Sequence, residues 1–140
     1  MTFPVPAQGL IPHREGMCCI DSILNVEGQQ VQASVTLHGD HLLLNEDGLL
    51  DRCGYVELAA QAACGLKGAD AAAGRASATA LLASVNHYRI FDDAKMDETL
   101  LICVAITTEL AGLSMLDFNV TCGPRLLASG QLKVFYQADN

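Results

Sequence analysis

Residues 54–66 read Gly-Tyr-Val-Glu-Leu-Ala-Ala-Gln-Ala-Ala-Cys-Gly-Leu, and this stretch decides the fold. Apolar side chains occupy nearly every position, so a helix formed here has almost no side suited to solvent. A helix that is apolar all round is a buried helix. Asp51 is a suitable N-cap, and Gly65 and Gly68 mark positions where the helix could end. We therefore predict one helix at the centre of the molecule.

Segments on both sides of this helix alternate between apolar and polar residues, which is typical of half-buried strands. The Gly123-Pro124 pair predicts a turn inside a C-terminal hairpin. Residues 69–80, rich in small side chains, are expected to form a loop or a frayed helix. We expect one α+β domain over residues 1–140. The predicted strands are Met17 to Val26, Val31 to Leu37, Leu81 to Phe91, Leu100 to Thr108, Leu116 to Cys122 and Leu126 to Tyr136.

The charge and the apolar content narrow the classes of partner. The 140-residue chain carries 16 acidic and 8 basic residues, a formal net charge of −8, and no Lys/Arg cluster. Nucleic acid and membrane surfaces are therefore not expected partners. The start lacks the pattern of a signal peptide, so a cytoplasmic location is expected. Hydrophobic residues make up 51% of this small chain, which predicts apolar surface buried between subunits and hence a homodimer.

Cysteine and histidine patterns give no sign of a metal. The six cysteines include no Cys-x-x-Cys pair and are interpreted as small buried hydrophobes. The sequence His38-Gly-Asp-His41 offers two potential ligands, but no convincing third and fourth ligand accompany them. We expect neither a metal nor a cofactor.

Two polar residues interrupt the apolar helix and are candidates for chemistry. Glu57 and Gln61 stand four residues apart and so share one stripe of the helix. Burial of a carboxylate is costly without a partner, and it raises the pKa toward the range that a general acid or base requires. The alternative is a structural ion pair between Glu57 and Arg52 or Arg89. Gln61 does not titrate and is interpreted as a hydrogen-bonding residue that orients its neighbour.

Several stretches resemble, in order along the chain, the 3-hydroxyacyl-acyl-carrier-protein dehydratases. Residues 10–14 (Leu-Ile-Pro-His-Arg) and the apolar run to Asp21 resemble the opening of those enzymes. Residues 56–62 resemble their central-helix signature, in which a catalytic Glu stands four residues before a Gln. Residues 87–91, 97–98 and 127–135 resemble their later strands and turn. This resemblance implies the hot-dog fold, an antiparallel sheet of five to six strands wrapped around one long central helix.

The sequence departs from the fatty-acid-synthesis members at one place. Those enzymes carry a Gly-His-Phe-Pro turn whose His stands fourteen residues before the Glu, and Leu43 occupies that position here. A Pro-Gly pair before the helix is replaced by Asp-Arg-Cys at residues 51–53. The chain is therefore more similar to the divergent dehydratases of aryl-polyene-type clusters.

The resemblance implies a dehydratase of 3-hydroxyacyl thioesters in fatty-acid or polyene-type biosynthesis. It implies that His13 acts as the base and Glu57 as the acid, facing each other across a dimer interface. His41 is the alternative base. A backbone N–H near Gly54 or Tyr55 would polarise the thioester carbonyl.

The expected partner is an acyl carrier protein or acyl-CoA. An acidic carrier would need a local basic rim, for which the candidates are Arg14, Arg52, Lys67, Arg75 and Arg89. Two alternatives stay open: an acyl thioesterase of the same fold, and a non-catalytic subunit that completes the site of an active dehydratase.

Overall fold

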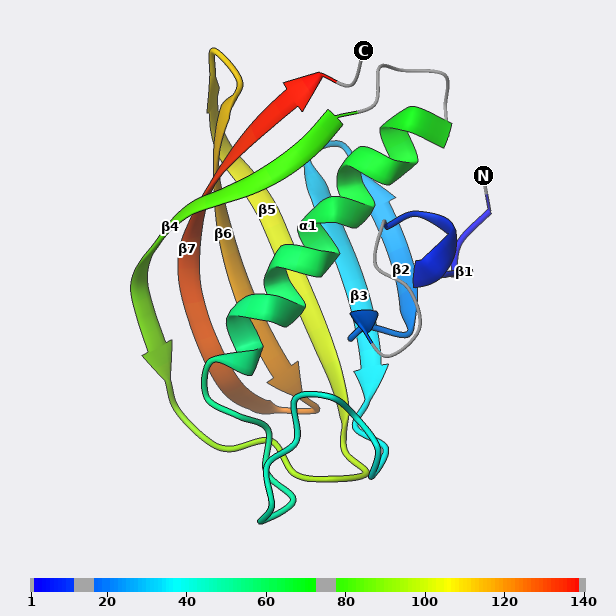
Figure 1. The fold of residues 1–140 in the computed structure, drawn as a ribbon, viewed down its shortest axis with the longest axis vertical. Helices are drawn as coiled ribbons and strands as arrows, with labels where there is room; N and C mark the ends of the chain where they lie inside the picture. The colour runs from blue at the N-terminus through cyan, green and yellow to red at the C-terminus, as the bar shows by residue number, and fades with distance from the viewer. Residues whose placement is uncertain (1, 12–16, 73–77, 139–140) are drawn as a thin grey trace.

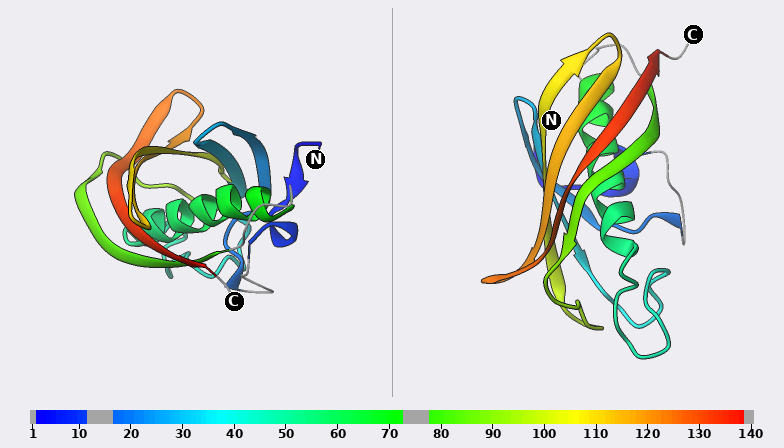
Figure 2. Two further views of the ribbon diagram at one scale, coloured as in Figure 1. Left: turned by 90° about the horizontal axis from the view of Figure 1, so that it is seen from above. Right: turned by 90° about the vertical axis from the view of Figure 1, so that its left-hand side faces the viewer.

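One long helix, α1 (Gly54–Ala72), lies across a seven-stranded antiparallel sheet in the computed structural model (Figure 1). The structure describes residues 2–11, 17–72 and 78–138. The sheet curls around the helix, as the view from above shows (Figure 2, left). This is the hot-dog fold that the sequence predicts.

The strands follow the order β1-β2-β3-β5-β6-β7-β4 across the sheet. Every neighbouring pair is antiparallel, and β4 forms one edge beside β7. A short 3-10 helix, η1, follows β1. The bounds are β1 (Val5–Pro6), η1 (Ala7–Gly9), β2 (Ser22–Glu27), β3 (Gln30–Thr36), β4 (Ala78–Ile90), β5 (Thr99–Leu110), β6 (Leu113–Cys122) and β7 (Arg125–Ala138).

The six predicted strands are present, and β1 is a seventh that is only two residues long. The first predicted strand was placed too early, because β2 begins at Ser22 rather than Met17. The Cys19 N–H donates to the side chain of Gln61 on α1, so this part of the chain is tied to the helix. The alternation in β6 is confirmed: Leu116, Phe118 and Val120 are buried, while Asp117 and Asn119 are exposed.

The helix continues past the two glycines at which it was predicted to end. Gly65 and Gly68 lie inside α1, which extends to Ala72. A Cβ on Gly68 would lie 1.8 Å from the carbonyl oxygen of Leu10, and one on Gly65 would lie 2.6 Å from Cδ1 of Ile23. These glycines therefore let neighbouring chain approach the helix closely and do not terminate it. Ala69–Ala72 belong to the helix, and Ala78–Ala80 open β4.

Candidate functional site

The side-chain amide of Gln61 links the predicted acid to a segment far away in sequence. Its Nε2 donates to Oε1 of Glu57 (2.8 Å) and to the carbonyl oxygen of Met17 (2.9 Å). Its Oε1 accepts from the Cys19 N–H (2.8 Å). Because the Cys19 N–H can only donate and the Met17 oxygen can only accept, the amide has one possible orientation. That orientation presents N–H to Glu57.

Gln61 is buried (1% exposed), whereas Glu57 is partly exposed. The structure thus places a fixed, buried amide beside a partly exposed carboxylate, and the catalytic roles of the two residues stay predictions. Arg52, one of the two arginines considered as a structural partner of Glu57, instead pairs with Asp93 (3.3 Å). The other, Arg89, is exposed on β4.

Two thiols lie within the electric field of the Glu57 carboxylate. Burial raises the pKa of Cys64 to about 11, and the negative charge of Glu57 adds to the effect. Burial and the same carboxylate also raise the pKa of Cys19. Both side chains are thus neutral thiols at pH 7, without the depressed pKa of a cysteine nucleophile. Cys53 is exposed, so the prediction of buried cysteines is wrong for this residue.

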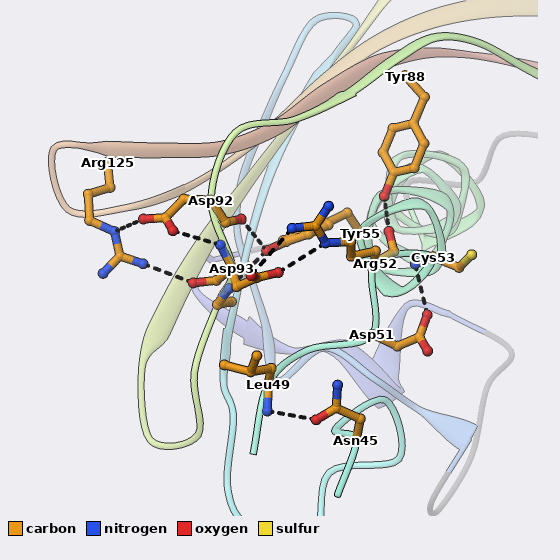
Figure 3. A network of polar contacts seen from close by, with 11 residues as sticks. Asn45, Leu49, Asp51, Arg52, Cys53, Tyr55, Tyr88, Asp92, Asp93 and Arg125 are labelled. Carbon is orange, nitrogen blue, oxygen red and sulfur yellow. Dashed lines mark hydrogen bonds and ion pairs between the residues drawn. The ribbon is translucent and has the colours of Figure 1, made fainter. Parts of the chain in front are cut away.

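Polar contacts fix the N-terminus of α1, where a thioester carbonyl was expected to bind (Figure 3). The Gly54 N–H donates to the Asp51 carbonyl (2.7 Å), and the Cys53 N–H donates to Oδ1 of Asp51 (2.9 Å). The Tyr88 hydroxyl donates to the carbonyl oxygen of Arg52. The Asp51 side chain thus closes the turn that leads into the helix, two residues earlier than the N-cap of a helix that begins at Gly54 would stand, and the Gly54 N–H is already engaged.

The Tyr55 side chain anchors the helix to the loop that follows β4. Its hydroxyl donates to the Asp92 carbonyl (2.9 Å) and accepts from the Ala94 N–H (2.9 Å). The ring is fully buried, and burial raises the pKa of the phenol. Arg125 holds the same loop from the opposite side, through Asp92 (3.2 Å) and Glu98 (2.9 Å). No local sequence pattern predicts this network, because its members come from separate elements.

Of the two candidate bases, His13 and His41, the structure describes only His41. His13 lies outside the described residues, and so do Arg14 and Arg75 of the expected basic rim. His41 is partly buried, and both of its ring nitrogens have partners: the Leu43 N–H lies 3.1 Å from Nδ1, and the Cys19 carbonyl lies 2.8 Å from Nε2.

Within residues 2–11, 17–72 and 78–138, no cluster of three or more His, Cys, Asp or Glu side chains is arranged to hold a metal ion. The same residues include no helix that combines the length and the apolar character needed to cross a bilayer.

Comparison with solved structures finds chains of similar fold. One chain of the dehydratase heterocomplex ApeI:P from Xenorhabdus doucetiae superposes with a TM-score of 0.85 at 21% identity, over 97% of this chain and 92% of that one. A hypothetical thioesterase from Streptococcus pneumoniae with coenzyme A superposes with a TM-score of 0.68 at 13% identity, over 84% and 86% of the two chains.

A Streptococcus mutans protein bound to acetyl CoA gives a TM-score of 0.67 at 15% identity, over 84% of this chain and 89% of that one. No curated protein matches the sequence. These structural likenesses establish the hot-dog fold. The model of the ApeP-like family, described as ApeP dehydratase, matches residues 5–140, and the chain therefore belongs to the ApeP-like dehydratase family.

Proposed function

We propose that the protein removes water from 3-hydroxyacyl thioesters to give trans-2-enoyl thioesters. The observation that carries this proposal is the Gln61 amide, which fixes the carboxylate of Glu57 at 2.8 Å on a helix face that is otherwise apolar. Protonated Glu57 gives its proton to the hydroxyl on C3, which leaves as water. A base takes the proton from C2, and the electron pair of that C–H bond forms the new double bond.

His13 is the base in this proposal. In the sequence, His13 lies between Ile11 and Met17, and both of these residues contact α1. Ile11 is buried beside Gly65, and the Met17 carbonyl accepts from Gln61. The Tyr55 N–H is the proposed donor to the thioester carbonyl, because the neighbouring Gly54 N–H is bonded to Asp51. A donor at a helix N-terminus stabilises the negative charge that develops on that oxygen.

A second chain completes the site in this proposal. Val56, Glu57, Ala60 and Cys64 form a partly exposed stripe on α1, whereas residues 58–59, 61–63 and 65–66 are buried. At the edge of the sheet, Leu81 and Leu82 of β4 are 49% and 48% exposed. A long, exposed, apolar strand edge is a template for pairing with another chain. Two open grooves of about 450 and 240 Å³ lie on the sheet, and neither is lined by Glu57.

The proposed second chain is another copy, which gives a homodimer. The likeness to a chain of the ApeI:P heterocomplex favours one alternative, in which this chain is a partner subunit of a heteromeric dehydratase. Light scattering of the purified protein, alone and with a co-expressed candidate subunit, separates the two assemblies. The carrier of the acyl group is proposed to be an acyl carrier protein, with acyl-CoA as the alternative.

The test is mass spectrometry of a 3-hydroxyacyl carrier protein, and of the matching CoA ester, after incubation with the purified protein. Loss of one water from the acyl group supports the proposal, provided that Glu57→Gln lowers the rate by roughly 10²- to 10⁴-fold and stays folded. Release of free carrier protein indicates a thioesterase instead. An unchanged substrate that is dehydrated only after a second subunit is added indicates the partner role.

A further inference from the structure

His41 joins two segments that lead to the candidate site. The Leu43 N–H lies at Nδ1 and the Cys19 carbonyl at Nε2 of its imidazole ring. An N–H group can only donate, and a carbonyl oxygen can only accept. The neutral ring therefore carries its proton on Nε2, donates that proton to Cys19 and accepts at Nδ1.

On one side, His41 and Gln61 hold the same residue from two directions. The carbonyl of Cys19 accepts from His41 (2.8 Å), and its N–H donates to Gln61 (2.8 Å). Gln61 then donates to Glu57. Both backbone polar groups of Cys19 are thus fixed, and Cys19 is buried. Release of the His41 bond frees one end of the segment that orients the Gln61 amide.

On the other side, His41 holds the loop that enters α1. Leu43 donates its N–H to His41 and accepts at its carbonyl from the Asp51 N–H (2.8 Å). The carbonyl of Asp51 accepts from the first amide of the helix, that of Gly54 (2.7 Å). One imidazole therefore connects the Cys19 segment with the loop that leads into α1.

We propose that His41 is a positioning residue and not the base. It fixes the Cys19 segment relative to the loop that leads into α1, and thereby the position of Glu57. The proposal rests on the dehydratase function proposed above. A base needs a ring nitrogen with a lone pair free for the substrate proton. The Nδ1 lone pair is occupied by Leu43, and Nε2 already carries a proton.

The substitutions His41→Gln, His41→Asn and His41→Ala separate the two roles. The Gln side chain places a donor near the position of Nε2, and Asn places an acceptor near that of Nδ1. Neither amide can act as a base. If His41 positions Glu57 through Cys19, His41→Gln retains kcat within about fivefold, while His41→Ala loses roughly 10- to 100-fold in kcat with little change in KM. His38→Ala, which removes an exposed histidine of the same loop, is the matched control.

A second measurement does not depend on activity. Nitrogen-15 NMR of the imidazole gives the tautomer of His41 in the wild-type protein, and the proposal requires the proton on Nε2. Amide hydrogen exchange at Cys19 is expected to accelerate about fivefold or more in His41→Ala, relative to His38→Ala.

The outcomes distinguish the inference from the function on which it rests. Equal loss of activity in His41→Gln and His41→Ala, at the 10²- to 10⁴-fold level of a lost base, overturns the inference while dehydration by the wild type stands. A proton on Nδ1, or unchanged exchange at Cys19, also overturns it. If the wild type dehydrates nothing, the proposed function fails, and with it the catalytic part of the inference. The NMR and exchange results then still decide whether His41 holds the Leu43 N–H and the Cys19 carbonyl in the way proposed.

Discussion

The carbonyl oxygen of Leu10 occupies the space where a side chain on Gly68 would begin. A Cβ built on Gly68 lies 1.8 Å from that oxygen and 2.7 Å from the carbonyl carbon of the same residue. The neighbouring Ile11 is buried and packs beside Gly65, one turn earlier on α1. The N-terminal segment thus contacts the helix at two glycines, immediately before the Pro-His-Arg stretch that contains the proposed base.

Gly68→Ala is expected to destabilise the protein by about 1–3 kcal/mol or more, because backbone cannot move away as readily as a side chain. The measurement is the free energy of unfolding from urea titration. Gly65→Ala meets the flexible end of Ile23 and should cost less. Gly9→Ala is the control, since nothing lies within 4 Å of its added Cβ. A Gly68→Ala protein as stable as Gly9→Ala would show that the segment does not pack closely on the helix.

The fold was predictable because its signals are local. The run of apolar residues in α1 and the alternation in β6 and β7 can be read within a dozen positions, and they place the elements correctly. The pairing of Glu57 with Gln61 also follows from helical spacing. Gly65 and Gly68 were misread because a glycine serves equally at a helix end and at a close contact. Their neighbours, Leu10 and Ile23, come from distant parts of the chain.

The partners of the site residues were not predictable for the same reason. Gln61 binds Met17 and Cys19, which are 44 and 42 residues away. No periodicity reports contacts of that range. The partners of His41 were hidden in the same way, because a histidine in a loop has no local signal that separates a base from a structural residue.

Tyr55→Phe is expected to destabilise the protein by about 1–3 kcal/mol, since it leaves the buried Ala94 N–H without its acceptor. It should also lower kcat of the proposed dehydration, because the loop after β4 holds the helix entry through this hydroxyl. The measurements are urea unfolding and the rate of water loss. Tyr88→Phe, which removes one bond at a less buried site, is the comparison and should cost less.

Glu98 should make stability fall in acid. Burial alone would raise the pKa of its carboxyl, but hydrogen bonds from the Lys95 N–H and the Arg125 guanidinium outweigh it and lower the pKa below its usual 4.5. A carboxyl with a lowered folded-state pKa contributes stability above its unfolded pKa and loses it as the pH falls through the folded value.

Glu98→Gln should therefore lower the free energy of unfolding near pH 7, by an amount of order 1 kcal/mol for this partly exposed ion pair. The difference from wild type should shrink as the pH falls below 4.5. Urea titrations at several pH values measure it. Glu27→Gln removes the same charge at an exposed site and controls for the change in net charge. A difference independent of pH would contradict the assigned ion pair with Arg125.

Cys64 reports the charge on Glu57 without any substrate. Because the pKa of Cys64 is about 11, only on the order of one molecule in a thousand carries the thiolate at pH 8, and alkylation there should be slow. Burial is the larger cause of the raised pKa of Cys64 and the Glu57 carboxylate is the second cause, so Glu57→Gln should lower the pKa of Cys64 and accelerate its labelling.

Mass spectrometry of peptides after timed iodoacetamide labelling gives the rate at each cysteine. Cys53 is exposed and serves as the internal reference. An unchanged ratio of Cys64 to Cys53 labelling would contradict the electrostatic interaction assigned between Glu57 and Cys64.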